Sequence, residues 1–333
     1  MCRELHAPFA AVTVTALALL GASCAQGPSP SVSGAREAPA SHPTGTYSIV
    51  ARDRRTGEMG VAVQSHWFQV GTMVSWAEAG VGAVATQALT NASFGPRGLA
   101  ALKAGSSPAE ALKALLDADP RRDQRQVAIV DSKGRVAQWT GRRCLPDAGH
   151  AKGPGFSVQA NMMSSEEIWP AMKRAFERSR GPLAERLLAA LAAAEGAGGD
   201  VRGAQSAALL VVPAKATDDV ARDRPVDIRV ADHPRPVEEL VRLLRLRRAY
   251  DASAAGDAAL AAGDLPRARR LFAKARRLAG SQRELAFWQA VSLQGAGHEK
   301  LARPLFDEVL AAEPRFRKVL ETLPAGGILT EHQ

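Results

Sequence analysis

Three short stretches of the sequence carry side chains that could do chemistry. The first, Gln64-Ser65-His66, ends an apolar, β-branched run beside Trp67 and Phe68. His66 could remove the proton of the Ser65 hydroxyl. Neighbouring strand residues point to opposite faces, however, so the fold would have to turn both side chains to one side. The alternative is a histidine at the surface or rim, with Gln64 and Ser65 only binding a substrate.

The second stretch contains Gln159 and Asn161, which lie two residues apart in "SVQAN". A period of two places both side chains on one face of a strand. Amide N–H groups there could donate to a developing oxyanion, so Asn161 is a candidate catalytic residue and Gln159 a candidate for substrate binding. The alternative is a buried amide pair that satisfies backbone groups of nearby loops.

The third stretch, "GGDVRGAQS", is a glycine-rich bend. We expect Asp200 and Arg202 to form an ion pair that fixes the bend. Gln205, with Ser206 beside it, is a candidate for substrate binding.

Other kinds of site find little support in the residues. Of the three cysteines, Cys2 would leave with a signal segment and Cys24 would be removed or lipidated, so Cys144 would remain alone. It follows two arginines that could lower the pKa of its thiol, and the alternative is a small buried residue. The seven histidines are scattered, and the sequence contains no HExxH, CxxC or GxSxG motif and no phosphate-binding loop. We therefore expect neither a metal nor a cofactor.

The elements that must position these side chains follow from the hydrophobic pattern. In chain order we expect four strands (46–52, 59–65 and two within 70–87), two helices (94–105 and 106–120), three strands (two within 125–141, one over 155–163), two helices (165–179 and 181–196) and two strands (206–214 and 225–232). Short turns between strands demand antiparallel pairing. Helices that come in pairs predict an α+β fold with helices outside a sheet sandwich, not a doubly wound parallel sheet.

The residues from Pro234 to the end predict a second, all-helical domain. Glycine, alanine, leucine and phenylalanine recur at a spacing of 34 residues, at 263, 268, 271 and 272 and again at 297, 302, 305 and 306. This is the period of tetratricopeptide repeats, and a helix over 237–262 would fasten the repeats to the first domain. Such a region would dock a protein partner or a second copy of the chain. The alternative is a plain helical extension that stabilises the first domain.

The first 45 residues predict export. Arg3 precedes the apolar run 7–20, which has the length of a signal-peptide core and is too short to cross a bilayer. Residues 21–24 resemble a bacterial lipobox with Cys24 as the lipidated residue, whereas residues 23–25 would suit ordinary signal cleavage. The Pro/Ser/Gly-rich stretch 25–45 suits a flexible tether. We expect a periplasmic protein or a lipoprotein that touches the membrane only through its lipid.

Composition argues against nucleic-acid binding. The formal net charge is +9, but only nine of the 43 basic side chains are lysine, in an alanine-rich chain. No block of five or more basic residues occurs, and aromatic residues make up 5% of the chain. A nucleic-acid interface would gather such residues in a patch.

The first domain resembles a bacterial family called domain of unknown function 1028. The resemblance covers about Thr46 to Val230 and rests on "TYSIVARD", "GVAVQSHWFQVG", "AGVGAVATQ", "RQVAIVDSKGR", "FSVQANMM" and "GGDVRGAQSAALLVV". The family is grouped with the N-terminal-nucleophile hydrolases, so the resemblance implies a four-layer αββα sandwich. It does not supply a reaction, because a fold does not fix a function.

The resemblance also implies a role for Thr46. In N-terminal-nucleophile enzymes the first residue of the first strand attacks through its side chain, and its free α-amine acts as the base. Gly45-Thr46 is similar to a junction whose cleavage would expose such a residue. A proteasome-like lysine shortly after it is missing, since the first lysine is Lys103. The alternative is that Thr46 begins a strand only because threonine suits strands.

Two functions remain open. The first is an exported hydrolase of an amide bond in a small molecule or peptide, with Thr46 as nucleophile and Asn161 or a backbone N–H as oxyanion donor. The second is a non-catalytic binding protein whose pocket is lined by Gln64, His66, Gln159 and Asn161 and whose helical region recruits a partner.

Overall fold

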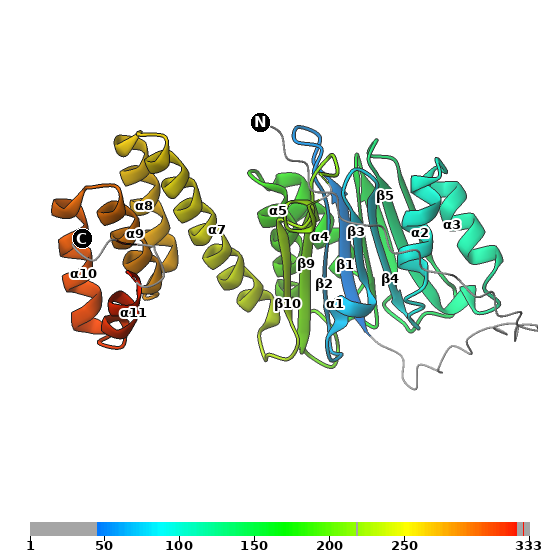
Figure 1. Cartoon of the computed structure of the whole chain (residues 1–333). Coiled ribbons are helices and arrows are strands. Elements are labelled where there is room, and N and C mark those ends of the chain that lie inside the picture. The colour runs from blue at the N-terminus through cyan, green and yellow to red at the C-terminus, as the bar shows by residue number, and fades with distance from the viewer. Residues whose placement is uncertain (1–44, 218, 325–328, 330–333) are drawn as a thin grey trace, which may run out of the picture. The chain divides into compact units, whose positions relative to one another are not determined.

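The computed structural model describes residues 45–217, 219–324 and 329. It is a mixed α+β structure with two antiparallel sheets and a C-terminal helical region (Figure 1). The expected signal segment, the tether and Cys24 lie outside the described residues. Among the residues described, we find no helix with the length and apolar character needed to cross a membrane.

The first sheet has six strands in the order β10-β9-β2-β1-β8-β7. Its register places Thr46 opposite Ser65 on one side and opposite Asn161 on the other, and Ser65 opposite Ser206. The polar ends of these strands therefore meet at one end of the sheet. The strands are β1 (Thr46–Arg52), β2 (Met59–Ser65), β7 (Gly149–Gly153), β8 (Phe156–Asn161), β9 (Ser206–Val212) and β10 (Val226–Val230).

The second sheet has four strands in the order β3-β4-β5-β6. Gln87 lies opposite Gln126, and Gln126 lies opposite Thr140. Polar residues therefore also gather at one end of this sheet. The strands are β3 (Ser75–Glu78), β4 (Gly82–Ala88), β5 (Arg125–Asp131) and β6 (Val136–Thr140).

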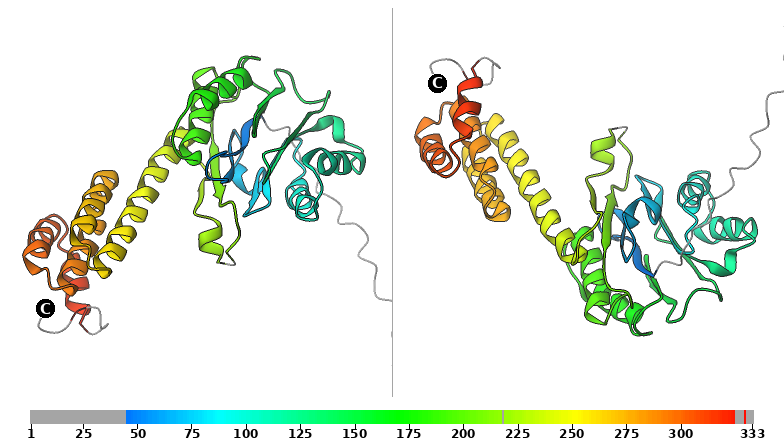
Figure 2. Two further views of the ribbon diagram at one scale, coloured as in Figure 1. Left: turned by 90° about the horizontal axis from the view of Figure 1, so that it is seen from above. Right: turned by 90° about the horizontal axis from the view of Figure 1, so that it is seen from below.

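The two sheets pack face to face, and helices cover both outer faces (Figures 1 and 2). Helices α2 (Phe94–Lys103) and α3 (Pro108–Asp117) lie on the four-stranded sheet. Helices α4 (Ile168–Arg178) and α5 (Leu183–Gly196) lie on the six-stranded sheet. Short helices α1 (Val70–Met73), η1 (Arg122–Gln124) and α6 (Val220–Asp223) occur in the connections.

The sequence explains why these elements form. Residues 46–51 of β1 are all buried, because alternate side chains meet the helices on one face and the second sheet on the other. Helix α3 begins with the capping box that its sequence predicts. The Ser107 hydroxyl accepts a hydrogen bond from the Glu110 N–H, and the Glu110 carboxylate accepts one from the Ser107 N–H.

The second group of strands has four members, so the expectation of three was wrong. The missing strand is β7, whose sequence "GHAKG" has neither β-branched residues nor apolar alternation. It lies at the edge of the six-stranded sheet and is held by pairing with β8. Tertiary pairing, not local propensity, makes this segment a strand.

The C-terminal region is helical throughout its described length from α7 to α11. The helices are α7 (Pro236–Ala261), α8 (Leu265–Ala279), α9 (Glu284–Gly295), α10 (Glu299–Ala312) and α11 (Phe316–Thr322). The first turns of α7 bury Val237, Leu240 and Leu244 in the core that also holds α5. Further on, the Phe272 ring lies against the α7 backbone at Gly256, where a Cβ atom would come within 2.5 Å of the ring.

Candidate active site

The space between the two sheets changes from apolar to polar along the strands. Val50, Val61 and Ala128 belong to the apolar part. At the other end the facing side chains are polar, and each is at most 2% exposed: Thr46, Ser48, Ser65, Gln87, Gln126, Gln159 and Asn161. Buried polar groups are costly unless they are hydrogen-bonded, so their bonding pattern defines this site.

Thr46 lies at the centre of this polar end, with its hydroxyl beside the peptide bond that precedes it. Its Oγ1 donates to Ser65 Oγ at 3.0 Å. Ser65 Oγ in turn donates to the carbonyl oxygen of Gly45 at 2.5 Å, and Arg202 Nη2 donates to the same oxygen at 3.0 Å. The Gly45 carbonyl is therefore held by one neutral and one cationic donor next to a hydroxyl group.

Gly45 fits this position because it has no side chain. A Cβ atom there would lie 2.5 Å from Asp200 Oδ2 and 3.0 Å from Arg202 Nη2. Asp200 and Arg202 form the ion pair that the sequence predicts, with Nη2 and Oδ2 2.7 Å apart. The Asp200 side chain is fully buried, so this pair is a fixed wall of the site and not a mobile surface contact.

Amide side chains fix the backbone of Thr46. Gln87 Nε2 donates to the Thr46 carbonyl oxygen at 2.9 Å, and Asn161 Nδ2 donates to it at 3.3 Å. Both amides also donate to Gln126 Oε1, at 2.7 and 3.1 Å. Asn161 therefore positions the nucleophile candidate, whereas the donors at the Gly45 carbonyl are Ser65 and Arg202.

The network continues from Gln126 toward a cavity. Gln126 Nε2 donates to Thr140 Oγ1 at 2.9 Å, and Thr140 Oγ1 lies 2.8 Å from Nδ1 of His150. Burial lowers the pKa of His150 below its ordinary value, with a smaller effect from Lys152, and this shift favours the neutral ring. Thr140 and His150 line a cavity of about 700 Å³ beside β6 and β7.

Backbone strain is concentrated at the same end of the sandwich. Ala88 ends β4 with φ +69°, and Met162 directly follows β8 with φ +59°. Gln69, in the loop after β2, has φ +55°. Residues other than glycine rarely adopt such angles, and they cluster where function requires a particular backbone shape.

Gln64 does not belong to this network. Gln64 lies opposite Tyr47 and points to the same face of β2 as Ala62. That face of the six-stranded sheet packs against α5. Gln64 is fully buried, and neither its amide nitrogen nor its amide oxygen has a hydrogen-bond partner among the described residues. Tyr47 donates to Glu195, and its pKa is raised well above the ordinary value by burial and then by Glu195.

Within the described residues, neither His66 nor Gln205 forms a hydrogen bond with the Thr46 hydroxyl. His66 is half-buried, and its Nδ1 has no hydrogen-bond partner within the described part of the chain. Gln205 Nε2 donates to Asp232 at 3.2 Å, and its backbone N–H donates to the Ser65 carbonyl, so it ties β9 to the loop after β10. The proposed pocket of Gln64, His66, Gln159 and Asn161 is therefore wrong, because Gln64 faces the helices while Gln159 and Asn161 face the other sheet.

Two further polar residues, Gln159 and Ser206, have structural roles. Gln159 Nε2 donates to Ser48 and to the Ala85 carbonyl, which links the two sheets. The Ser206 hydroxyl donates to the Trp67 carbonyl and accepts from the Val70 N–H. Burial raises the pKa of the Cys144 thiol to about 11, so the suggestion that its neighbouring arginines lower that pKa was wrong.

Sequence reasoning missed Gln87 and Gln126. In β4, Gln87 follows the apolar residues Ala83 and Ala85 on the same face of the strand. In β5, Gln126 precedes the apolar residues Ala128 and Val130 on the same face. A single amide on an otherwise apolar face is the signal that could have found them. Within the described residues, no group of three His, Cys, Asp or Glu side chains is placed to hold a metal ion.

Comparison with known proteins defines the family. The model of a family of unknown function, DUF1028, matches residues 46–240. The chain is also similar to the crystal structure of protein SPO2555 from Silicibacter pomeroyi, described as a DUF1028 protein, with 33% identity, a TM-score of 0.55, and coverage of 60% of this chain and 85% of that one. No curated protein matches. The chain therefore belongs to the DUF1028 family.

Proposed function

We propose that this protein is a hydrolase of the N-terminal-nucleophile type, in which cleavage of the Gly45–Thr46 bond exposes Thr46 as the nucleophile for an amide substrate. The observation that carries the proposal is the pair of donors on the Gly45 carbonyl beside the Thr46 hydroxyl. Two donors aimed at one carbonyl oxygen in a buried site form an arrangement that stabilises an oxyanion.

The cleavage is an N-to-O acyl shift followed by hydrolysis. Thr46 Oγ1 attacks the Gly45 carbonyl carbon and passes its proton to Ser65 Oγ, 3.0 Å away, while Ser65 passes its own proton to the Gly45 oxygen to which it is hydrogen-bonded. The charge that develops on the Gly45 oxygen is stabilised by Arg202 and by the Ser65 hydroxyl. The carbonyl then re-forms as the C–N bond breaks and the proton on the Gly45 oxygen passes to the nitrogen of Thr46, and water hydrolyses the resulting ester. The products are a Gly45 carboxylate and a free Thr46 amine.

The same residues would serve a second reaction on a substrate. A free α-amine has a pKa of about 7.7 to 8.0, so it is a base for the Thr46 hydroxyl at neutral pH. Asn161 and Gln87 hold the Thr46 carbonyl, which keeps the nucleophile in place after the preceding residues have left. An amide carbonyl in the place of Gly45 would meet Arg202 and Ser65.

The architecture is consistent with this proposal. Two facing sheets between two helix pairs are the layers expected of an αββα N-terminal-nucleophile fold. The family match begins at Thr46, the residue that cleavage would make the first of the chain. Fold alone would not support an activity, and the proposal depends on the contacts of Gly45 and Thr46.

We further propose that the C-terminal helices form a tetratricopeptide-like region that docks a protein partner or a second copy. Gly263 and Gly297, 34 residues apart, both have φ +78° and follow α7 and α9. Ala268 and Ala302 are each fully buried at the same place in the next helix. Matching turns and matching burial are what a two-helix repeat requires.

The intact mass of the exported protein tests the hydrolase proposal. We expect a chain that begins at Thr46. Thr46→Ala should remain uncleaved, whereas Thr46→Ser should still be processed. A mature chain that begins at Cys24 with lipid, or at Gln26, and retains Gly45 would refute the proposal. If Cys24 is lipidated, processing would also release the folded domain from the membrane, so its appearance in the soluble periplasmic fraction should depend on Thr46.

A further inference from the structure

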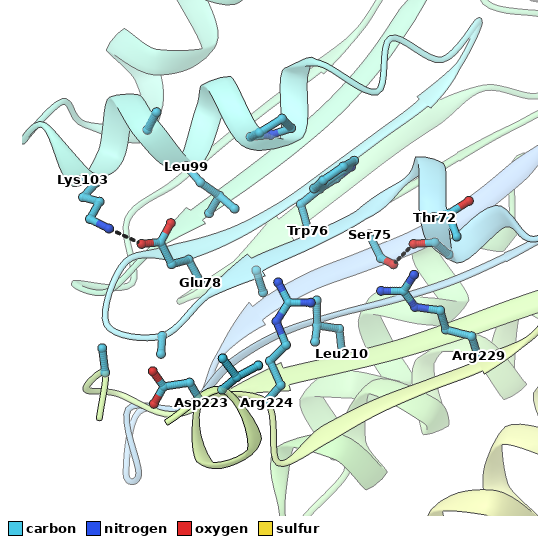
Figure 3. Close-up of a pocket in the computed structure, with 17 residues that line it drawn as sticks. Thr72, Ser75, Trp76, Glu78, Leu99, Lys103, Leu210, Asp223, Arg224 and Arg229 are labelled. Atoms are coloured by element: carbon cyan, nitrogen blue, oxygen red, sulfur yellow. Dashed lines mark hydrogen bonds and ion pairs between the residues drawn. The ribbon is translucent and has the colours of Figure 1, made fainter. Parts of the chain in front are cut away.

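A cavity of about 800 Å³ runs beside strand β3, on the side away from β4 (Figure 3). Its lining includes Ser75, Trp76 and Ala77 of β3, Leu99 of α2 and Leu210 of β9. β3 is the last strand of the four-stranded sheet, so one side of its backbone has no strand partner within the described structure.

The register shows which backbone groups face the cavity. Ser75 lies opposite Ala85, so continuing the register by one residue places Val74 opposite Thr86. The Thr86 N–H donates to the Val74 carbonyl, so residues 74 and 86 are a hydrogen-bonded pair. Hydrogen-bonded and non-bonded pairs alternate along an antiparallel ladder. Ser75 and Ala77 are therefore non-bonded pairs with β4, and their N–H and C=O groups point toward the cavity.

The cavity lies where a fifth strand of this sheet would be. The six-stranded sheet continues past β9 to β10, whereas the four-stranded sheet stops at β3. Asp227 and Arg229 of β10 pair with Leu210 and Ala208 of β9. They lie on the sheet face opposite Val226 and Val230, which pack in the helix-side core. A strand added to β3 would therefore lie over β10 and its charged side chains.

The two faces of such a strand would meet different surroundings. On the side of α2, the Trp76 indole lies flat against the helix backbone at Gly95, where a Cβ atom would come within 2.2 Å of the ring, and its Nε1 donates to the Met73 carbonyl. Trp76 and Leu99 thus form a fixed apolar wall on this side of the cavity (Figure 3).

The opposite wall carries two guanidinium groups. Arg224 and Arg229 extend toward the cavity and share one carboxylate, that of Asp227, which lies 3.5 Å from Arg224 Nη1 and 2.9 Å from Arg229 Nε (Figure 3). Glu78 is paired with Lys103 at 2.6 Å, and Asp223, also on the lining, accepts from Thr217. Asp227 uses only some of the N–H groups of these two guanidinium groups, and the remaining N–H groups can donate to a further carboxylate.

We propose that this cavity binds an extended peptide that adds as a fifth strand to β3, with acidic side chains toward Arg224 and Arg229 and apolar side chains toward Trp76. The acidic residues would lie opposite Ser75 and Ala77 and exchange main-chain hydrogen bonds with them. An apolar residue between them would lie opposite Trp76. This is recognition by strand addition, in which main-chain bonds give affinity and alternate side chains give specificity.

The probe is the fluorescein-labelled peptide Leu-Glu-Leu-Glu-Leu, titrated with the full chain and followed by fluorescence anisotropy. We expect saturable binding that weakens at least tenfold when both glutamates are N-methylated, because their N–H groups are then lost. Arg224→Gln should weaken binding several-fold. Arg222→Gln is the matched control, because Arg222 lies two residues away but does not line the cavity, and it should leave binding unchanged.

Three results of the peptide titration would overturn the proposal. They are absence of binding at millimolar peptide, equal binding of the N-methylated peptide, and equal loss of affinity in Arg222→Gln. Sedimentation velocity identifies the other occupant of this edge. If the chain is a dimer that Arg224→Gln dissociates, and the peptide does not compete, a second copy covers β3 and the peptide proposal is wrong.

Discussion

Removal of one hydroxyl group, in Ser65→Ala, tests the cleavage chemistry most directly. Ser65 Oγ accepts a hydrogen bond from the Thr46 hydroxyl and donates one to the Gly45 carbonyl oxygen. Loss of a single oxyanion donor in an enzyme lowers the rate by about 10²- to 10³-fold, or about 2.7 to 4 kcal/mol. Arg202 still donates to the Gly45 oxygen in the variant. The variant also loses the group that takes the Thr46 proton, so we expect cleavage of Gly45–Thr46 to slow by at least about a hundredfold without being abolished.

The same substitution has a smaller effect on stability. Ser65 is fully buried, and without it the Thr46 hydroxyl loses its acceptor. An unsatisfied buried hydroxyl costs about 1 to 3 kcal/mol, against a typical total of about 5 to 15 kcal/mol. The variant should fold, so slow cleavage would not reflect unfolding.

The full chain is made by cell-free synthesis, which sets the starting time of the cleavage reaction. The fraction of cleaved chains is then followed over time by intact mass. Ser206→Ala is the matched control, because Ser206 lies opposite Ser65 in the register, is equally buried and loses two hydrogen bonds of its own. Its hydroxyl bonds to the 67–70 loop and not to Gly45. If Ser65→Ala cleaves as fast as the wild type, or if Ser206→Ala slows cleavage as much, the assignment of oxyanion donors is refuted.

Three further predictions concern neighbouring features. Gly45→Ala should slow cleavage at least tenfold in the same assay, because the added Cβ atom at residue 45 would lie 2.5 Å from Asp200 Oδ2. An unchanged rate would show that Asp200 can move to make room for the methyl group. Cys144 should react with iodoacetamide about a hundredfold more slowly at pH 8 than a thiol of pKa 9.0. The reason is that its pKa of about 11 leaves only about one molecule in a thousand as thiolate at pH 8. The rate should rise as the pH approaches 11. Asp119→Ala should cost about 3 to 5 kcal/mol in urea denaturation, because it removes the carboxylate partner of the buried Arg125. Burial alone would raise the pKa of Asp119, but hydrogen bonds led by that from Arg125 lower it, so this stability is present at neutral pH and should be lost as pH falls below about 4.

The strands that carry the site were predictable because their hydrophobic pattern is local. Thr46, Ser65 and Asn161 were each placed on a strand from its alternation, and the bend at Asp200 and Arg202 from its glycines. A period of two also placed Gln159 and Asn161 on one face. These inferences need only the neighbours of each residue in the chain.

The assembly of the site was not predictable from local pattern. Gln64 and Ser65 are adjacent, yet strand pairing turns Ser65 toward the second sheet and Gln64 toward α5. Gln126 joins the network only because the second sheet stacks on the first in one register, which no single segment specifies. The hydrogen bond from Arg202 to the Gly45 carbonyl oxygen joins residues that are 157 positions apart in the sequence.

The burial of Thr46 orders the events in the proposed mechanism. Its side chain is fully buried, and Gly45, itself buried, occupies the place in front of Arg202 and Ser65 where a substrate carbonyl would have to lie. No external amide can reach the hydroxyl until that residue leaves. In the proposed mechanism the uncleaved chain is therefore an inactive precursor, and hydrolysis of any added substrate should appear only in proportion to the fraction of chains that begin at Thr46. Activity in a preparation that is wholly uncleaved by mass would place the reaction elsewhere on the molecule.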